Sequence, residues 1–529
     1  MGRKERERKS KRNLAPQTPV AKRPAAGSGN PASSVSSGGV ETEREPARAP
    51  PPNPAAVSSA GMTCHPRGDS WITAADVAGT PKMPSWHEFL KPSRLARPLR
   101  MCFPCVGINN GGRFLHEAGC EYTITDAHDI IGGLKRALLE LDPATANNMH
   151  LGSTGDVTQV QLKDLKRPVD VLMAGSPCPS FSNQGRKKPK EDPRTLVTVA
   201  VLHWVVFLIK FGGLLYVLLE NVKGISNKLF HNNTKSFMDL VLELLQSFCP
   251  EFVWRVDVLN ASGYKLAHKR NRVFLQGIRR CVVDVVPPPL PSFGTAKLRD
   301  FLKPDLPNTP RSDLTPQMQA NLISYEEMLK KELTAGLINA GDLVVCEVDR
   351  ACDRVYKQQY HVEAVPTLKT GNKYLFIMST DDLHMDDSSR AVFRWLMPYE
   401  RPALQGVDPC VSLTMNVKQL IHACGNAYPV PLIAACANPA VDAMSRWPKF
   451  TQWVQQAFPD ADDIKHGTEF QDQLMKILNE PGEAEVGEAD AGGKRQRMND
   501  GHVQKKPATN AIRIRWGTSH SDSSSSSSG

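Results

Sequence analysis

Residues 169–182 have the sequence VDVLMAGSPCPSFS. The β-branched, apolar run at its start predicts a buried strand, and Gly175-Ser176-Pro177 ends that strand sharply. Cys178 then stands between two prolines that fix the backbone on either side of it. A second buried strand is predicted over 214–219, and Glu220 follows it directly. Because ligands of open α/β sheets bind at the carboxyl ends of the strands, we expect Cys178 and Glu220 to reach one site, as nucleophile and proton donor.

Five motifs along residues 99–440 resemble, in order, those of the cytosine-5 DNA methyltransferases. They are Pro-Cys-x-x-Phe-Ser at 177–182, Glu-Asn-Val at 220–222, His-Lys-Arg-Asn-Arg at 268–272, Arg-Trp-Leu-Met-Pro-Tyr-Glu with Leu-Gln-Gly at 394–406, and Gly-Asn-Ala at 425–427. His268 stands where the family has glutamine, and Met397 where it has threonine. A lone cysteine after a strand is usually a buried structural thiol, so the order of the motifs carries the resemblance.

The resemblance implies an α/β fold, with a Rossmann-like S-adenosylmethionine-dependent methyltransferase sheet, a small target-recognition domain and disordered tails. It implies methyl transfer from S-adenosyl-L-methionine to carbon 5 of a cytosine flipped out of duplex DNA. Cys178 would add to ring carbon 6, which makes carbon 5 nucleophilic, and Glu220 would protonate ring N3. Arg270 and Arg272 would supply fixed donors to the carbonyl O2 and orient the acid. The predicted substrate-binding residues are Pro177, Ser182, Arg186 and Asn221.

The cofactor half of the site is predicted from a strand at 99–103, a glycine turn at 107–112 and a helix from Arg113. With Gly111-Gly112 in the family register, Gly107 and Asn109 replace the family's phenylalanine and first glycine. An acid after the second strand should bind the ribose hydroxyls; Asp126 is the preferred candidate and Asp129 its rival. The predicted cofactor-binding residues are Gly107, Asn109, Gly111, Gly112, Asp126, Asp156 and Asn426.

The cysteines, the apolar stretches and the net charge bear on metal binding, cellular compartment and the type of partner. Cys102 and Cys105 form a Cys-x-x-Cys without a second ligand pair at zinc spacing, so we expect packing there and no metal. Twelve cysteines without a recognisable signal peptide favour a reducing compartment. The apolar stretch 196–219 is better explained by a helix from Arg194 to Lys210 and a strand than by a membrane span. The net charge of +10 favours a polyanionic partner.

The chain divides by composition. Residues 1–80 are predicted to be a disordered basic tail, and 3–12 resemble a nuclear-import signal or nucleic-acid arm, although a merely solvated charged tail is equally compatible. The catalytic domain is expected over 81–285, a small target-recognition region over 286–390, closing motifs and C-terminal helices over 391–480, and a disordered tail over 481–529. A helix is expected near 324–337, strands near 342–348 and 374–378, and an amphipathic helix over 470–478.

Three functions remain open. We favour a monomeric, nuclear DNA cytosine-5 methyltransferase. The first alternative is the same reaction on RNA (tRNA), since tRNA-modifying members share the fold; against it, a Cys-Phe-Thr stretch typical of those members is missing. The second is a catalytically weak DNA-binding scaffold, favoured only by the altered glycine turn and by His268.

Overall fold

The computed structural model describes residues 70–81, 85–91, 93–108, 110–141, 148–177, 181, 192–227, 234–352, 360–371, 375–455 and 465–479. Four of the predicted site residues lie outside these ranges: Asn109, Cys178, Ser182 and Arg186. Residues 1–69 and 480–529, which hold most of both predicted tails, also lie outside them.

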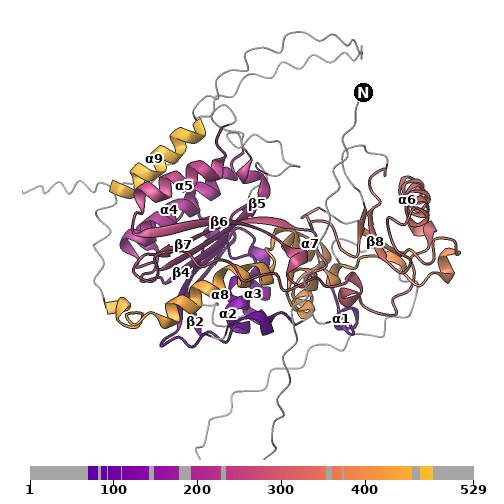
Figure 1. The fold of residues 1–529 in the computed structure, drawn as a ribbon, viewed down its shortest axis with the longest axis horizontal. Helices are drawn as coiled ribbons and strands as arrows, with labels where there is room; N and C mark the ends of the chain where they lie inside the picture. The colour runs from indigo at the N-terminus through magenta and orange to yellow at the C-terminus, as the bar shows by residue number, and fades with distance from the viewer. Residues whose placement is uncertain are drawn as a thin grey trace, which may run out of the picture. The chain divides into compact units, whose positions relative to one another are not determined.

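The larger of two sheets has seven strands in the order β3-β2-β1-β4-β5-β7-β6 (Figure 1). Their bounds are β1 Leu99–Phe103, β2 Tyr122–Asp129, β3 Met149–Leu151, β4 Val171–Gly175, β5 Tyr216–Val222, β6 Phe252–Asn260 and β7 Asn271–Arg279. Strands β1 to β5 pair in parallel, and β7 runs antiparallel to both β5 and β6. The strand order reverses between β1 and β4, the position where open sheets of this kind form a ligand crevice. The α/β fold and the strands predicted from 99, 169 and 214 are confirmed.

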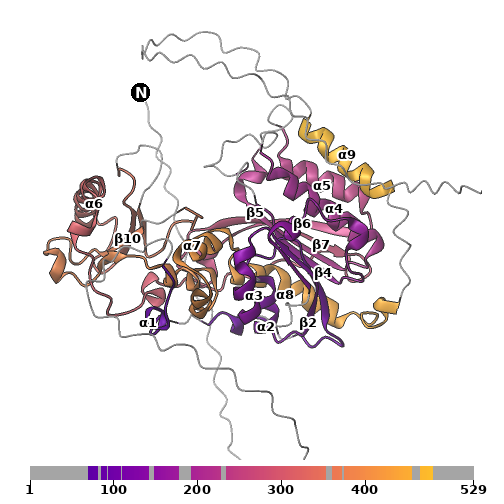
Figure 2. The same cartoon turned by 180° about the vertical axis from the view of Figure 1, so that it is seen from behind.

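Helices cover both faces of this sheet (Figures 1 and 2). One face carries α2 Asn110–Glu117, α3 Lys135–Leu141 and α8 Val430–Arg446; the other carries α4 Thr195–Phe211, α5 Phe237–Phe248 and α9 Lys465–Asn479. Successive side chains of a strand point to opposite faces of the sheet. Met101 and Phe103 therefore pack in one core, and Cys102 packs in the other.

Helix α4 is apolar around nearly its whole circumference because the sheet, α5 and α9 enclose it. The predicted helix and strand over 194–219, and the amphipathic helix near the C-terminus, are therefore confirmed. Among the described helices, no single one is long and apolar enough to cross a membrane. Only α7 Val417–Asn426 and α8, joined at a bend of 40°, meet the length and composition criteria as a pair.

The smaller sheet has four antiparallel strands in the order β11-β10-β8-β9. They are β8 Leu343–Glu347, β9 Tyr360–Val362, β10 Leu375–Ser379 and β11 Phe393–Trp395. One face packs on α6 Pro316–Thr334, and the other joins the core of the large sheet. Helix α6 begins well before the predicted Ser324, because Thr315 caps it by accepting from Met318 N and Pro316 fits its first turn. Strand β11 lies beyond the boundary expected at residue 390.

Residues 70–80 are a correction to the predicted tail. They hold α1 Ala74–Val77, whose capping box joins Thr73 and Asp76. Ile72 and Val77 are buried in the main core, and Ser70 O accepts a hydrogen bond from Val417 N at 3.0 Å. Two well-placed apolar side chains are enough to dock a segment whose average composition is that of a disordered chain.

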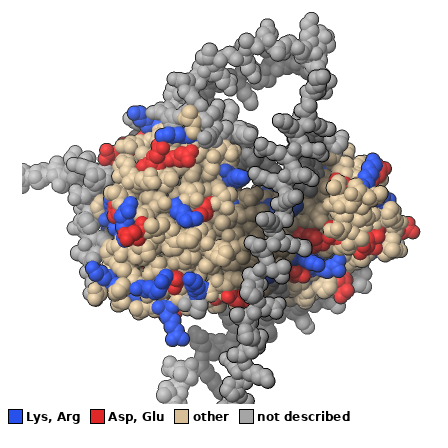
Figure 3. Space-filling model, viewed as in Figure 1, with Lys and Arg blue, Asp and Glu red and all other residues tan. Residues whose placement is uncertain are grey.

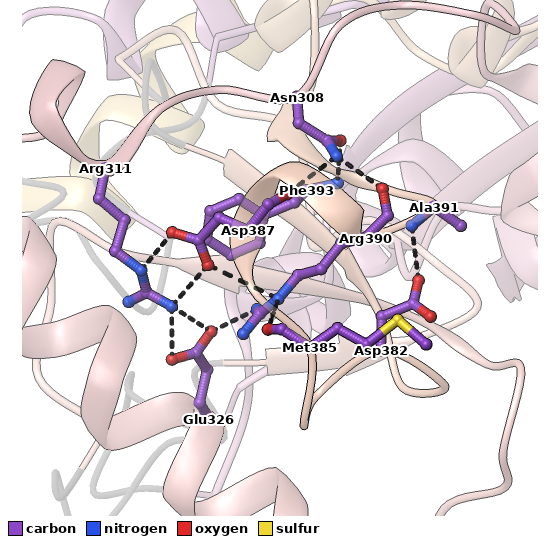
Figure 4. A network of polar contacts seen from close by, with 9 residues as sticks. All are labelled: Asn308, Arg311, Glu326, Asp382, Met385, Asp387, Arg390, Ala391 and Phe393. Carbon is purple, nitrogen blue, oxygen red and sulfur yellow. Dashed lines mark hydrogen bonds and ion pairs between the residues drawn. The ribbon is translucent and has the colours of Figure 1, made fainter.

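An ion-pair network fixes the small sheet to α6 (Figure 4). Glu326 of α6 accepts from Arg311 at 2.7 Å and from Arg390 at 2.5 Å, and Asp387 accepts from Arg311 at 2.5 Å. Both guanidinium groups also lie over the ring of Phe393, at 5.2 and 4.6 Å. Glu326 is therefore the acid shared by two arginines, one of them almost fully buried.

Replacing Glu326 with alanine should lower the free energy of unfolding by about 3 kcal/mol, because the buried Arg390 would lose its close carboxylate and keep only the more distant Asp387, at 3.6 Å. Glu327→Ala, at the exposed neighbouring position on the same helix, should change it by less than about 0.5 kcal/mol. Urea unfolding of the two variants measures the difference. Equal stabilities would show that the network contributes nothing to folding.

Candidate active site

A cavity of about 220 Å³ lies at the carboxyl ends of the parallel strands. Its walls come from the turns after β1 and β2, the ends of β4 and β5, the start of β7 and the segment after α7. The lining residues used below are Cys105, Gly107, Asp129, Asp156, Ser176, Pro177, Glu220, Arg270, Arg272, Asn426 and Tyr428. Pro177 lines this cavity. It directly precedes Cys178, the predicted nucleophile, which lies outside the described residues.

Glu220 and Arg272 form a buried ion pair on the cavity wall. Arg272 Nε lies 2.6 Å from Glu220 Oε1, and the two side chains are 9% and 10% exposed. The antiparallel register of β5 and β7 places Arg272 opposite Val222, two residues after the acid on the same rim. The ion pair places the guanidinium against one carboxylate oxygen; that Arg272 orients the acid stays a prediction.

Arg270 has different contacts from Arg272. Its Nη1 donates to Leu368 O at 3.1 Å and Gly425 O at 3.4 Å, and its Nη2 donates to Ala427 O at 2.6 Å. Burial, with the nearby charge of Arg272, lowers the pKa of this guanidinium. Arg270 lines the cavity, and these backbone bonds join three chain segments, while its Nε has no hydrogen-bond partner among the described residues. Its predicted contact with substrate stays a prediction.

Both ring nitrogens of His268 have a backbone partner. Its Nε2 accepts from Leu368 N at 3.1 Å, and its Nδ1 lies 3.2 Å from Leu404 O, which can only accept. These two contacts require the neutral tautomer with the proton on Nδ1. A glutamine amide offers the same acceptor and donor. The substitution that favoured the scaffold alternative thus leaves the local hydrogen bonds satisfied.

Of the two acids considered for the ribose hydroxyls, it is the rival, Asp129, that lines the cavity. Strand β2 continues to Asp129, whose carboxylate lines the cavity and accepts from Gly107 N and Ile131 N, both at 2.9 Å. Burial raises the pKa of Asp129, and these two N–H groups oppose the shift. Asp126 instead accepts from Lys166 N at 3.0 Å and does not line the cavity. Gly107 has a φ of +55°, the left-handed conformation that glycine adopts most easily.

The glycine pair is also placed differently from the prediction. Helix α2 begins at Asn110 rather than at Arg113, so Gly111 and Gly112 lie in its first turn and not on the cavity. A Cβ at Gly111 would lie 2.7 Å from Phe103 Cε1 and 3.1 Å from Met173 Sδ. Gly111 therefore permits close packing of α2 on the sheet, and no cofactor contact by either glycine is supported.

Two further predicted cofactor residues do line the cavity. Asp156 Oδ1 accepts from the backbone N and the hydroxyl of Thr158, at 2.9 and 2.7 Å, which fixes its turn. Asn426, at the end of α7, lies with its Nδ2 3.4 Å from His422 Nδ1. Their predicted contacts with adenosine stay predictions.

Asn221 lies behind the cavity wall rather than on it, contrary to its predicted contact with substrate. Its Oδ1 accepts from Val222 N at 2.8 Å, and its Nδ2 lies 3.5 Å from Ser176 Oγ. The amide therefore braces the two strand ends that carry Ser176 and Glu220.

Sequence analysis missed Tyr428 and Cys105 as cavity residues. The Tyr428 ring packs against Gly175, where a Cβ would lie 2.5 Å from Tyr428 Cδ1. Burial raises the pKa of the Tyr428 hydroxyl, and the nearby Glu220 adds to the shift. The position of Tyr428 in the sequence could have indicated this role. It follows the closing Gly-Asn-Ala motif, and Gly175 ends the strand before Cys178.

The neutral His268 predicts a specific pH dependence of stability. Burial lowers its pKa well below 6.5, and Arg270, Arg272 and His361 add to that shift. Below 6.5 the unfolded histidine binds a proton that the folded one does not, so stability falls with decreasing pH. His268→Gln should remove this contribution, about 1.4 kcal/mol near pH 5.5, and leave stability near pH 7.5 almost unchanged. Urea unfolding at both pH values measures it; the exposed His116→Gln is the control. Parallel curves for wild type and His268→Gln would contradict the assignment.

Comparison with known proteins agrees with this geometry. A family model described as C-5 cytosine-specific DNA methylase matches residues 145–441, more than half of the chain. Among curated proteins, the type II methyltransferase M.DsaV of Dactylococcopsis salina is 28% identical over 158 residues, which cover 29% of this chain and 41% of that protein. M.XorII of Xanthomonas oryzae pv. oryzae is 28% identical over 170 residues, 31% of this chain and 37% of that protein. The chain thus spans well under half the length of these relatives.

Solved structures show weaker similarity. A putative DNA modification methyltransferase from an Escherichia coli prophage has a TM-score of 0.42 at 15% identity, covering 66% of this chain and 100% of that one. The Dnmt2 methyltransferase of S. pombe has a TM-score of 0.40 at 13% identity, covering 65% and 99%. On the match of more than half its length to the family model, this chain belongs to the C-5 cytosine-specific DNA methylase family.

Proposed function

We propose that this protein is a DNA cytosine-5 methyltransferase that uses S-adenosylmethionine and a covalent Cys178 intermediate. The observation that carries the proposal is the buried Glu220–Arg272 pair, which shares one cavity with Pro177, the residue before Cys178. Removing a carboxylate and a guanidinium from water costs free energy. Such a buried pair at a strand end, in a cavity, is therefore a candidate functional site.

In the proposed reaction, the Cys178 thiolate forms a bond to carbon 6 of cytosine, and the ring electrons move toward N3. Glu220 delivers a proton to N3, so the ring becomes a neutral enamine with a nucleophilic carbon 5. Arg272 orients that acid and offers a remaining N–H to the carbonyl O2. S-adenosylmethionine, when bound, supplies an electrophilic methyl group. Once carbon 5 carries the methyl group, with S-adenosylhomocysteine as the leaving group, loss of the carbon-5 proton to a base expels the thiolate, and N3 returns its proton to Glu220.

The cavity fits an adenosyl group in its chemistry. Ile130, Ile131 and Val157 provide apolar walls suited to a flat base. Asp129 and Asp156 present carboxylates suited to the ribose hydroxyls and the adenine amino group. The Asp129 oxygens each accept one backbone hydrogen bond and retain lone pairs for a ligand.

DNA as the substrate is supported by the net charge of +10 and by the family. On the face in Figure 3, the described Lys and Arg side chains are interspersed with Asp and Glu, so that face offers no large area of one sign. The basic residues at 3–12 support a nuclear location and added affinity for polyanions. A monomer is part of the same proposal.

The cofactor assignment predicts that Asp129→Ala weakens binding of S-adenosylhomocysteine at least about 10-fold, a loss of about 1.4 kcal/mol. Isothermal titration calorimetry measures it, with the exposed Asp164→Ala as the control. Wild-type affinity in folded Asp129→Ala would remove this acid from the cofactor site.

The catalytic assignment predicts that Cys178→Ser lowers methyl transfer to duplex DNA by at least about 1,000-fold, because a hydroxyl is a far weaker nucleophile than a thiolate. Glu220→Gln should lower it by about 100- to 10,000-fold, since an amide cannot protonate N3. Glu243→Gln, at an exposed position, should behave as wild type.

Labelled S-adenosylmethionine with duplex DNA and tRNA in parallel is the measurement. Transfer to tRNA alone would establish the RNA alternative. DNA binding without transfer to either substrate would establish the scaffold alternative.

A further inference from the structure

Three potential metal ligands lie together on the large sheet, away from the lining of the active-site cavity. Asp126 and His128 are on β2, and His150 is opposite His128 on β3. One ligand atom from each lies within 4.8 Å of the others. Residues two apart on a strand, and partners on adjacent strands, share a face. This face is the one covered by α4, where Trp204 meets His128 edge-on at 5.0 Å.

His128 is the observation that indicates a ligand. Its side chain is 4% exposed, and within the described part of the chain neither ring nitrogen has a hydrogen-bond partner. Buried polar groups are normally satisfied, and an exception calls for a missing ion or water. The ring stacks on His150 at 4.5 Å with 18° between the planes, so the two imidazoles are neighbours, and one ring must turn for both to direct a nitrogen to a single ion.

We infer that Asp126, His128 and His150 form a binding site for a divalent transition-metal ion of the zinc type. Two imidazoles and a carboxylate are a donor set for such ions, whereas magnesium and calcium prefer oxygen ligands alone. Asp126 Oδ1 lies 4.0 Å from His128 Nε2, whereas two ligand atoms of a tetrahedral zinc site are about 3.3 Å apart, so the side chains must close around the ion. Small side-chain rotations would bring the three atoms around one ion.

The surroundings suit this role. The other oxygen of Asp126 accepts from Lys166 N at 3.0 Å, which orients the carboxylate as outer-sphere partners of metal ligands do. His150 is only half-buried, so the site is open on one side to an entering ion and to a water as further ligand. Cys102 is paired in register with Asp126 and is buried on the same face, but it is not one of the three clustered ligands.

The ion would stabilise the cofactor side of the active site. Strand β3 has only three residues and lies at the edge of the sheet, held by β2. The turn that follows it packs through Gly155 against the carbonyls of Asp129 and His150 and carries Asp156 into the cavity. A metal bridging β2 and β3 would fix the base of that turn. The sequence expectation of no metal considered only cysteine spacing and did not include this cluster.

The test is metal content of the full-length protein. After treatment with a chelator and equilibration with Zn²⁺, wild type should retain about one zinc ion per chain by mass spectrometry of the metal. His150→Ala, at the half-buried position, should lose it, and His150→Gln should do the same if the alanine variant does not fold. His116→Ala, at an exposed histidine of α2, should retain it. Zinc should raise the melting temperature of wild type and of His116→Ala only.

Three results would overturn the site. The first is a folded wild type that retains no zinc. The second is a His150 variant that retains it. The third is loss of zinc in Cys105→Ser together with a thiolate-to-metal charge-transfer band after cobalt substitution, which would place the ion at the Cys-x-x-Cys. None of these readouts depends on methyl transfer, so they leave the proposed function untouched.

Discussion

The antiparallel pairing of β7 with β5 is the constraint on which the site depends. A strand inserted in this direction begins where β5 ends, so Arg272 meets Glu220 at the rim without any long loop. The residues just before β7 then connect distant parts of the chain. His268 holds Leu368 and Leu404, and Arg270 holds the segment 425–427. Residues 268–272 thus contact Glu220, the segment around Leu368 and the closing segment after α7.

The closing segment completes the cavity from the other end of the chain. Tyr428 packs on Gly175, the last residue of the strand that leads to Cys178. The ring of Tyr428, just before α8, therefore links the closing segment to the end of β4. Asp129 belongs to the same assembly, because its carboxylate fixes the Gly107 turn. The cavity is built from segments that are far apart in the chain and meet at the carboxyl ends of the strands.

The sequence predicted the parts of the fold that have strong local signals. Buried strands at β1, β4 and β5 and the apolar helix α4 were recovered, because continuous apolar runs leave little choice of structure. The sequence did not predict where β2 ends. Residues 123–129 show no alternation of apolar and polar side chains, so Asp126 was preferred to Asp129. Strands β9 and β11 have three residues each, too few to show a period. The start of α6 was missed although its Thr-Pro signal was present, and residues 70–80 were assigned from average composition.

The direct test of the central claim is the position of the covalent bond. A duplex with 5-fluorocytosine cannot lose the atom at carbon 5, so a thiolate that has added to carbon 6 stays attached after methyl transfer. Cys105 is a thiol that lines the cavity and could compete with Cys178 as the nucleophile. Incubation with S-adenosylmethionine, denaturation and peptide mass spectrometry would locate the link. The account predicts an adduct on Cys178, formed far more slowly in Glu220→Gln; an adduct on Cys105, or none with active enzyme, would contradict it.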